Sequence, residues 1–273
     1  MDFPDLPHIW PALLLMPCVI GGLAGLLAGL LGVGGGIILV PGFYALLRAA
    51  GYPQADLMHI AVATSLATIV PTGLSSALAH RQREVVRPDI LQSMGFAVVI
   101  GAFAGSLLAV RVEGDLLKTV FGAFLVGLSG FVALGDRLRH RSGPPPGRAA
   151  MALAGLGTGG ISSLLGIGGA TFTVPFLSFV GLPLREAIGT AAALGVLISI
   201  PACAGFIAGT GGATISVPFT LGYVFVPGLV LAAPASILMA PAGARLAHSL
   251  PVRALRFVFA LFMVAVGLRM LAE

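Results

Sequence analysis

The sequence predicts an all-α integral membrane protein built from two inverted repeats, and three observations lead to this prediction. Of the 273 residues, 58% are apolar and 9% are charged. A soluble domain carries about 25% charge, so this chain cannot cover a water-facing surface. Apolar segments follow one another along the whole chain. A glycine-rich sequence occurs once in each half, as GLLGVGGGIILVP (residues 29–41) and as SLLGIGGATFTVP (residues 163–175).

Each half contains the same succession of apolar segments. In the first half they run from Trp10 to Leu31, Ile37 to Leu47, Leu57 to Ala79, Ile90 to Val110 and Leu116 to Leu134. In the second half they run from Ala149 to Leu165, Thr171 to Val180, Ala187 to Ala208, Phe219 to Ala247 and Leu255 to Leu271. The segment after each motif is too short for a span, which needs about 20 residues. We therefore predict, in each half, a glycine-broken helical hairpin that turns back inside the membrane, followed by three transmembrane helices.

A basic, proline-rich stretch, GDRLRHRSGPPPGR, separates the two halves. Such a composition is typical of a linker outside the membrane. We predict a first repeat over residues 1–135, a cytoplasmic linker over residues 136–148 and a second repeat over residues 149–273. The halves share further residues at one common offset: Leu117, Phe121, Phe124 and Gly105 match Leu255, Phe259, Phe262 and Gly243.

Loop charge predicts how the repeats are oriented. The loop at residues 80–87 and the linker are strongly basic, and short basic loops face the cytoplasm. The loop at residues 209–217 occupies the equivalent place in the second half but carries no charge. Equivalent loops of opposite character belong on opposite sides, which indicates inverted repeats with the N-terminus outside. The alternative, in which each glycine region is one long crossing, gives parallel repeats.

The glycine motifs predict an anion site. An anion inside a bilayer needs hydrogen-bond donors, and the apolar segments have no lysine or arginine near their middle. Backbone N–H groups at the start of a helix supply donors and a partial positive charge. We expect Gly34, Gly35 and Gly36 to present such groups together with Gly168 and Gly169. The alternative is that these glycines allow close packing of helices.

Hydroxyl groups add donors of a suitable kind. Thr64, Ser65, Thr171 and Thr190 lie in the repeated segments near the motifs, and we predict that they complete the substrate-binding site. The alternative for each is a hydrogen bond back to its own helix.

Other chemistries have less support. The basic residues lie in short loops, which argues against a nucleic-acid partner, and no Cys/His spacing predicts a metal or cofactor site. Histidines lie near the segment ends, where His59 or His80 would relay a proton if transport is proton-coupled. The sequence GLSG around Ser129 is similar to the serine motif of intramembrane proteases, so a serine hydrolase is the alternative from another class. Apart from this alternative, we expect a protein that is not an enzyme.

Both halves resemble the TauE/SafE family of membrane anion exporters. The first motif with AVATSLATIVPTGLSSALAH resembles the family's first half, and GISSLLGIGGATFTVPFLSFVGLP with GARLAHSLPVRALRFVFALFMVAVGLRML resembles its second half. The resemblance implies export of sulfite, sulfoacetate or other organosulfonates across the bacterial cytoplasmic (inner) membrane. The second motif departs from the first, since Ala170, Thr171 and Thr173 replace Gly36, Ile37 and Leu39. A coupling proton, a homodimer and a passive channel or facilitator for the same anions stay open.

Overall fold

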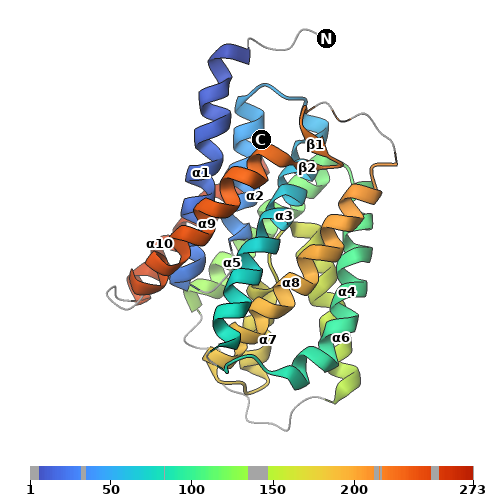
Figure 1. The fold of residues 1–273 in the computed structure, drawn as a ribbon, viewed down its shortest axis with the longest axis vertical. Coiled ribbons are helices and arrows are strands. Elements are labelled where there is room, and N and C mark those ends of the chain that lie inside the picture. The colour runs from blue at the N-terminus through green and yellow to red at the C-terminus, as the bar shows by residue number, and fades with distance from the viewer. Residues whose placement is uncertain are drawn as a thin grey trace.

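The structure is a computed structural model that describes residues 6–31, 35–82, 84–134, 147–211, 215, 217–246 and 252–272. These residues form ten helices and one β-hairpin (Figure 1). The first half contains α1 (Leu6–Leu31), α2 (Gly36–Ala49), α3 (Gln54–Arg81), α4 (Pro88–Arg111) and α5 (Gly114–Leu134). The second half contains α6 (Arg148–Leu165), α7 (Ala170–Phe179), α8 (Leu184–Ala208), β1 (Thr220–Leu221), β2 (Val224–Phe225), α9 (Val226–Leu246) and α10 (Val252–Ala272).

The helices have the length and surface of a multi-pass membrane protein. Among the described residues, α3, α4, α8 and the stretch Val226–Gly243 of α9 are long and apolar enough to cross a membrane. Large apolar side chains also point outward, and Phe96, Leu153 and Leu238 are between 70% and 79% exposed. Soluble monomers rarely expose apolar surface on this scale, whereas lipid accommodates it. The chain is therefore an all-α integral membrane protein, as the composition predicts.

Each glycine motif interrupts the helical chain. The first break separates α1 from α2, and the second separates α6 from α7. Helix α2 has 14 residues and α7 has 10, and both are shorter than the roughly 20 residues of a full span. Gly166 ends α6 in the left-handed conformation, with φ of +69°, which glycine adopts without steric cost. Pro41 and Pro175 lie inside α2 and α7 and do not end these helices.

The first helix of each half packs against the fourth helix of the other half. Helix α1 contacts α9, and α6 contacts α4. A Cβ added to Gly21 would meet the backbone of Ala232, and one added to Gly25 would meet that of Ser236. Residue numbers thus rise together along both helices, so α1 and α9 run parallel.

The α6–α4 pair repeats this arrangement. A Cβ on Gly155 would lie 2.8 Å from the Met94 carbonyl oxygen, and one on Gly159 would meet the backbone of Val98. Gly155 and Gly159 follow Gly21 and Gly25 at the offset that aligns the two motifs. The same pair of contacts therefore occurs twice, once with each half supplying the first helix.

Helices α5 and α10 pack against each other in the opposite sense. A Cβ on Gly122 would approach Gly267 and Leu271, whereas one on Gly267 would approach Leu125 and Val126. Residue numbers rise along one helix and fall along the other, so the two helices are antiparallel. Parallel first–fourth pairs with an antiparallel fifth pair are what inverted repeats give, whereas one long crossing at each glycine region would make the fifth pair parallel as well.

The segment before α9 differs from the prediction of a helix starting at Phe219. Residues 220–225 form the antiparallel pair β1–β2, in which Thr220 lies opposite Phe225 and Leu221 opposite Val224. Gly222 turns the chain with φ of +55°, a conformation that favours glycine over other residues. The helix therefore begins only at Val226.

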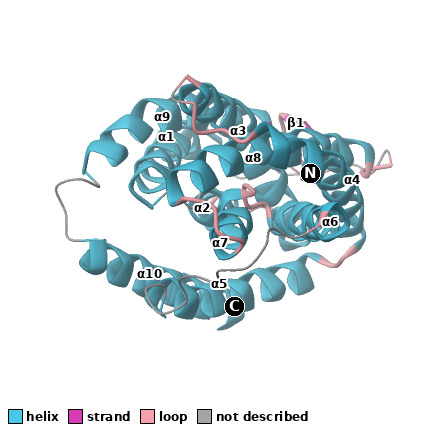
Figure 2. Cartoon of the chain, turned by 90° about the horizontal axis from the view of Figure 1, so that it is seen from below, coloured by secondary structure: helices cyan, strands magenta, loops and turns pink. Residues whose placement is uncertain are grey.

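The interior is centred on α3. Every residue from Leu57 to Ile69 is buried, a run that covers almost four turns and every face of the helix. Figure 2 shows the short helices α2 and α7 near the middle of the molecule, with α5 and α10 along one side and α3 and α8 along the other. At the two breaks, Gly36 and residues 166–169 are buried.

Candidate functional site

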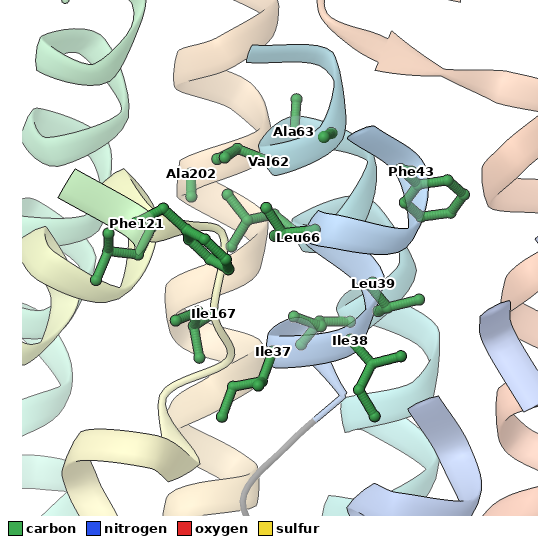
Figure 3. Close-up of a cluster of buried hydrophobic side chains, with 14 of the residues drawn as sticks. Ile37, Ile38, Leu39, Phe43, Val62, Ala63, Leu66, Phe121, Ile167 and Ala202 are labelled. Carbon is green, nitrogen blue, oxygen red and sulfur yellow. The ribbon is translucent and has the colours of Figure 1, made fainter. Parts of the chain in front are cut away.

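The two glycine breaks contact each other. A Cβ added to Gly36, the first residue of α2, would lie 2.7 Å from the Gly166 carbonyl oxygen and 2.8 Å from the Ile167 Cα. Figure 3 shows Ile37 and Ile167, which follow these glycines, in one buried apolar cluster. Only glycine permits such a close approach of backbones, so Gly36 has a packing role at the point where the breaks meet.

Ser65 holds the second break in place. Its hydroxyl on α3 donates a hydrogen bond of 2.7 Å to the Gly166 carbonyl, and both groups are buried. The carbonyl lies in the loop between α6 and α7. Ser65 therefore anchors the loop to the central helix rather than bonding back to its own helix.

The start of α7 presents backbone donors. Gly169 precedes the helix, and its carbonyl accepts hydrogen bonds from the N–H groups of Phe172 (3.3 Å) and Thr173 (2.8 Å). The first N–H groups of a helix have no acceptor within it, so those of Gly169 and Ala170 are available to a ligand. The Gly168 carbonyl accepts a hydrogen bond of 3.4 Å from the Thr171 N–H.

The first motif is described only from Gly35 onward, and the predicted ligand Gly34 lies outside the described residues. The Gly35 carbonyl accepts hydrogen bonds of 3.0 Å from the N–H groups of Ile38 and Leu39. A Cβ on Gly35 would lie 3.3 Å from that of Ala24 on α1. Gly35 thus sits at the start of α2 and packs closely against α1.

Thr64 and Thr190 are used to join the two halves. The Thr64 hydroxyl oxygen accepts the backbone N–H of Phe225 at 2.9 Å, directly before α9. The Thr190 hydroxyl oxygen accepts the backbone N–H of Arg87 at 3.0 Å, directly before α4. Each threonine therefore fixes the start of the fourth helix of the other half. Both bonds use an acceptor lone pair of the hydroxyl oxygen, and neither uses the O–H donor that an anion needs.

Two hydroxyls outside the predicted site have the environment expected of a ligand-binding group, because they are buried and lack a hydrogen-bond partner among the described residues. Thr173 and Ser162 are completely buried, and among the described residues neither side-chain oxygen has a hydrogen-bond partner. Thr171, which was predicted as a ligand, is 4% exposed on the first turn of α7. The sequence does carry a signal for Thr173, because the first motif has the apolar Leu39 at the corresponding position.

His59 is buried, whereas its place near a segment end suggests an interfacial side chain. Its Nε2 atom lies 3.1 Å from the Ala109 carbonyl oxygen and 2.9 Å from that of Val112, at the end of α4. Its ring centroid lies 5.1 Å from that of Tyr223 between the two strands. Nε2 therefore carries a hydrogen and donates it to these carbonyls.

Lys118 is a buried cation close to the start of α5. It is 5% exposed, and its amine lies 3.4 Å from an Asp115 carboxylate oxygen. Lys118 lies in the second turn of α5 and not near its middle, which agrees with the absence of cations near the middle of the apolar segments.

A basic cavity of about 560 Å³ lies apart from the glycine breaks. It is bordered by the starts of α4 and α6 and by the α7–α8 connection, and its polar lining includes Arg87, Arg148, Gln92 and Ser93. Arg87 forms ion pairs of 2.9 Å with Asp89 and 3.0 Å with Glu186. The hydrogen bonds that Arg87 donates to these two carboxylates raise the pKa of Arg87, so its charge persists at every physiological pH.

Ser129 does not stand out as a nucleophile. Its hydroxyl donates a 2.6 Å hydrogen bond to the Val126 carbonyl of its own helix, which is the common state of a serine in a membrane helix. An activated serine instead donates to a base.

Comparisons with known proteins identify a family and several relatives of this chain. The family model described as "Sulfite exporter TauE/SafE" matches residues 18–270. A protein of Haemophilus influenzae named "Probable membrane transporter protein" is 32% identical, over 94% of this chain and 97% of its own length. A protein of Methanocaldococcus jannaschii with a similar name is 27% identical, over 95% of this chain and 96% of its own length.

A longer relative from Paramagnetospirillum magneticum, "Probable membrane transporter protein MamO", is 28% identical over 92% of this chain and 43% of its own length. No solved structure gives a significant match. Because the family model covers nearly the whole chain, the protein belongs to the TauE/SafE family of membrane transporters.

Proposed function

We propose that the protein exports a small sulfur-containing anion, sulfite or an organosulfonate, across the bacterial inner membrane. The observation that carries this proposal is the buried contact of the two glycine breaks, where Gly36 lies against the backbone of Gly166 and Ile167. Broken helices that meet in the interior of a repeated membrane fold are the usual place of a transporter's binding site. The family's description names sulfite export, which supports the choice of anion.

The proposed site binds through backbone groups. It comprises the predicted glycines of both motifs, with Thr171 and Ser65 beside them, while Thr64 and Thr190 position the helices around it. The start of a helix carries roughly half a positive charge, and its N–H groups point toward a ligand. Such a site holds an anion without a buried cation, so binding is moderate and release is feasible.

We propose the predicted domain organisation and orientation for the membrane-embedded protein: residues 1–135 and 149–273 as inverted repeats, joined by a cytoplasmic linker at residues 136–148. In this orientation the basic cavity at Arg87 and Arg148 opens toward the cytoplasm.

Efflux from proteoliposomes tests the function. Vesicles that contain the purified protein are loaded with sulfite, and external sulfite is followed over time. We expect efflux from the unchanged protein and strongly reduced efflux from Gly168→Leu, because a Cβ on Gly168 already lies 3.3 Å from the Ile69 side chain. Gly127→Leu is the matched control, because nothing lies within 4 Å of a Cβ at Gly127. Equal efflux from both variants, or none from the unchanged protein, contradicts the proposal.

A passive channel or facilitator is the second candidate. Among the described residues, the buried polar side chains include no aspartate or glutamate, the groups that most often carry coupling protons in membrane transporters. Accumulation of sulfite against its gradient, driven by an imposed pH gradient, excludes this candidate, whereas mere equilibration supports it.

A further inference from the structure

We propose that the anion binds on the second hairpin alone, between the N–H groups at the start of α7 and the hydroxyl of Thr173, while the first hairpin forms an apolar wall. This inference rests on the proposed function and names the ligand groups. It replaces a site shared equally by two mirrored motifs with an asymmetric one.

The hydroxyl of Thr173 lacks the partner that other threonines in this protein have. Thr68 and Thr72 donate back to carbonyls one turn earlier, at 2.8 Å and 3.0 Å. For Thr173 the corresponding carbonyl is that of Gly169, which already accepts two backbone N–H groups. A carbonyl oxygen has two lone pairs, so no acceptor site is left for the hydroxyl. Thr173 is completely buried, and buried hydroxyls without a partner are rare and costly.

The hydroxyl borders the same space as the backbone donors. A Cβ built on Gly169 would lie 3.5 Å from the Thr173 Oγ1 atom and 3.5 Å from the Cα of Gly195 on α8. A Cβ built on Gly195 has only the Gly169 nitrogen within 4 Å, at 3.7 Å. A Cβ at Gly169 would also lie 2.5 Å from the Ile198 Cδ1 atom, so this α8 side chain borders the place and would have to turn aside for a bound ligand. A bound anion would meet the Gly169 nitrogen and the Thr173 hydroxyl at once.

The first hairpin lacks the two hydroxyl donors of the second. Leu39 and Ile37 occupy the positions that correspond to Thr173 and Thr171, and both side chains are at most 1% exposed in the apolar cluster of Figure 3. Apolar side chains exclude water from the site and strengthen hydrogen bonds to a bound anion. The asymmetry also selects the ligand class, since separate amide and hydroxyl donors suit an anion with several acceptor oxygens better than a halide.

Replacing Thr173 tests the inference. Thr173→Val keeps the shape and removes the donor, Thr173→Ser keeps the donor, and Thr68→Val removes a hydroxyl that already has a partner. Initial rates of sulfite efflux are measured at increasing internal sulfite. A hydrogen bond to a charged ligand corresponds to about a tenfold to hundredfold change in affinity, so Thr173→Val should raise the half-saturating concentration by that factor. Thr173→Ser and Thr68→Val should stay near the unchanged protein.

Thermal unfolding of the purified variants without ligand separates binding from folding. An orphaned hydroxyl stabilises nothing, so Thr173→Val should unfold at the same temperature as the unchanged protein or higher. Loss of affinity together with a lower unfolding temperature points to a structural role and overturns the inference, as does unchanged half-saturation in Thr173→Val. If the unchanged protein moves neither sulfite nor a sulfonate, the proposed function itself fails; if it does so and Thr173→Val is equal, only the asymmetric site fails.

Discussion

Thr64 in the first half and Thr190 in the second half each form an equivalent hydrogen bond with the other half. Thr64 on α3 accepts the N–H of Phe225 before α9, and Thr190 on α8 accepts the N–H of Arg87 before α4. Phe225 follows Arg87 at the same offset that relates Gly105 to Gly243. The two halves are therefore joined by a pair of matching contacts from a threonine side chain to the backbone, one buried and one partly buried.

Removing either hydroxyl should destabilise the protein. In Thr64→Val the Phe225 N–H stays buried without a partner, which costs about 1–3 kcal/mol. Thr190→Val should cost less, because its bond with Arg87 is only partly buried. Thermal unfolding in detergent measures both effects, with Thr64→Ser as the control that keeps the oxygen. Equal stability of Thr64→Val and Thr64→Ser contradicts the role assigned to this bond.

Gly36 should tolerate substitution much less well than Gly168. A Cβ at Gly36 would meet backbone atoms of Gly166 and Ile167, which cannot move without shifting the loop. A Cβ at Gly168 would meet only the flexible Ile69 side chain. Overpacking costs about 1–3 kcal/mol, so Gly36→Ala should lower the unfolding temperature and Gly168→Ala should leave it nearly unchanged. The reverse order of stabilities would show that the breaks do not meet in this way.

Ser65→Ala should weaken the attachment of the second break to α3. The Gly166 carbonyl would lose its 2.7 Å hydrogen bond in a buried place, at a cost of about 1–3 kcal/mol. Ser65→Thr keeps a hydroxyl and is the control. Hydrogen exchange of the peptides that contain residues 163–170 measures the effect, and faster exchange confined to these peptides is expected. Exchange that rises equally everywhere would indicate a global loss of stability instead.

The sequence predicts the helical architecture well because membrane helices obey local rules. Apolar length marked the helices to within a few residues, except at the start of α9, and the clusters around Gly34 and Gly168 marked both breaks. These signals can be read from the sequence, since each depends on a run of neighbouring residues. The β-hairpin at residues 220–225 was not predicted, because its residues are as apolar as those of the helix that follows.

Side-chain roles at the candidate site are harder to predict, because they depend on contacts between distant segments. Thr64 lies 161 residues from Phe225 and Ser65 lies 101 residues from Gly166. No local pattern indicates that these hydroxyls hold backbone groups of the other half. Thr173 likewise differs from Thr68 only because a carbonyl one turn earlier is already occupied.

The ion pair between Arg87 and Glu186 should contribute little to stability. The two side chains are 45% and 30% exposed, and exposed pairs contribute about 0–1 kcal/mol, less at high salt. Glu186→Gln should therefore lower the unfolding temperature slightly at low salt and not at all in concentrated salt. Unfolding is compared at both salt concentrations, with Thr190→Val as a salt-insensitive reference. A large, salt-independent effect of Glu186→Gln contradicts this expectation.

The loops that contain Gln82 and Thr210 should lie on opposite sides of the membrane. Both loops connect the third to the fourth helix of a half, so inversion separates them, whereas parallel repeats place them on the same side. Single cysteines, Gln82→Cys or Thr210→Cys, are introduced into a background with Cys18→Ala and Cys203→Ala. A membrane-impermeant thiol reagent applied to intact cells should label Thr210→Cys alone, because basic loops stay in the cytoplasm. Gln82→Cys should react only after permeabilisation, which also shows that its thiol is accessible. Labelling of both variants from outside would establish parallel repeats and remove the basis for a site between two inverted hairpins.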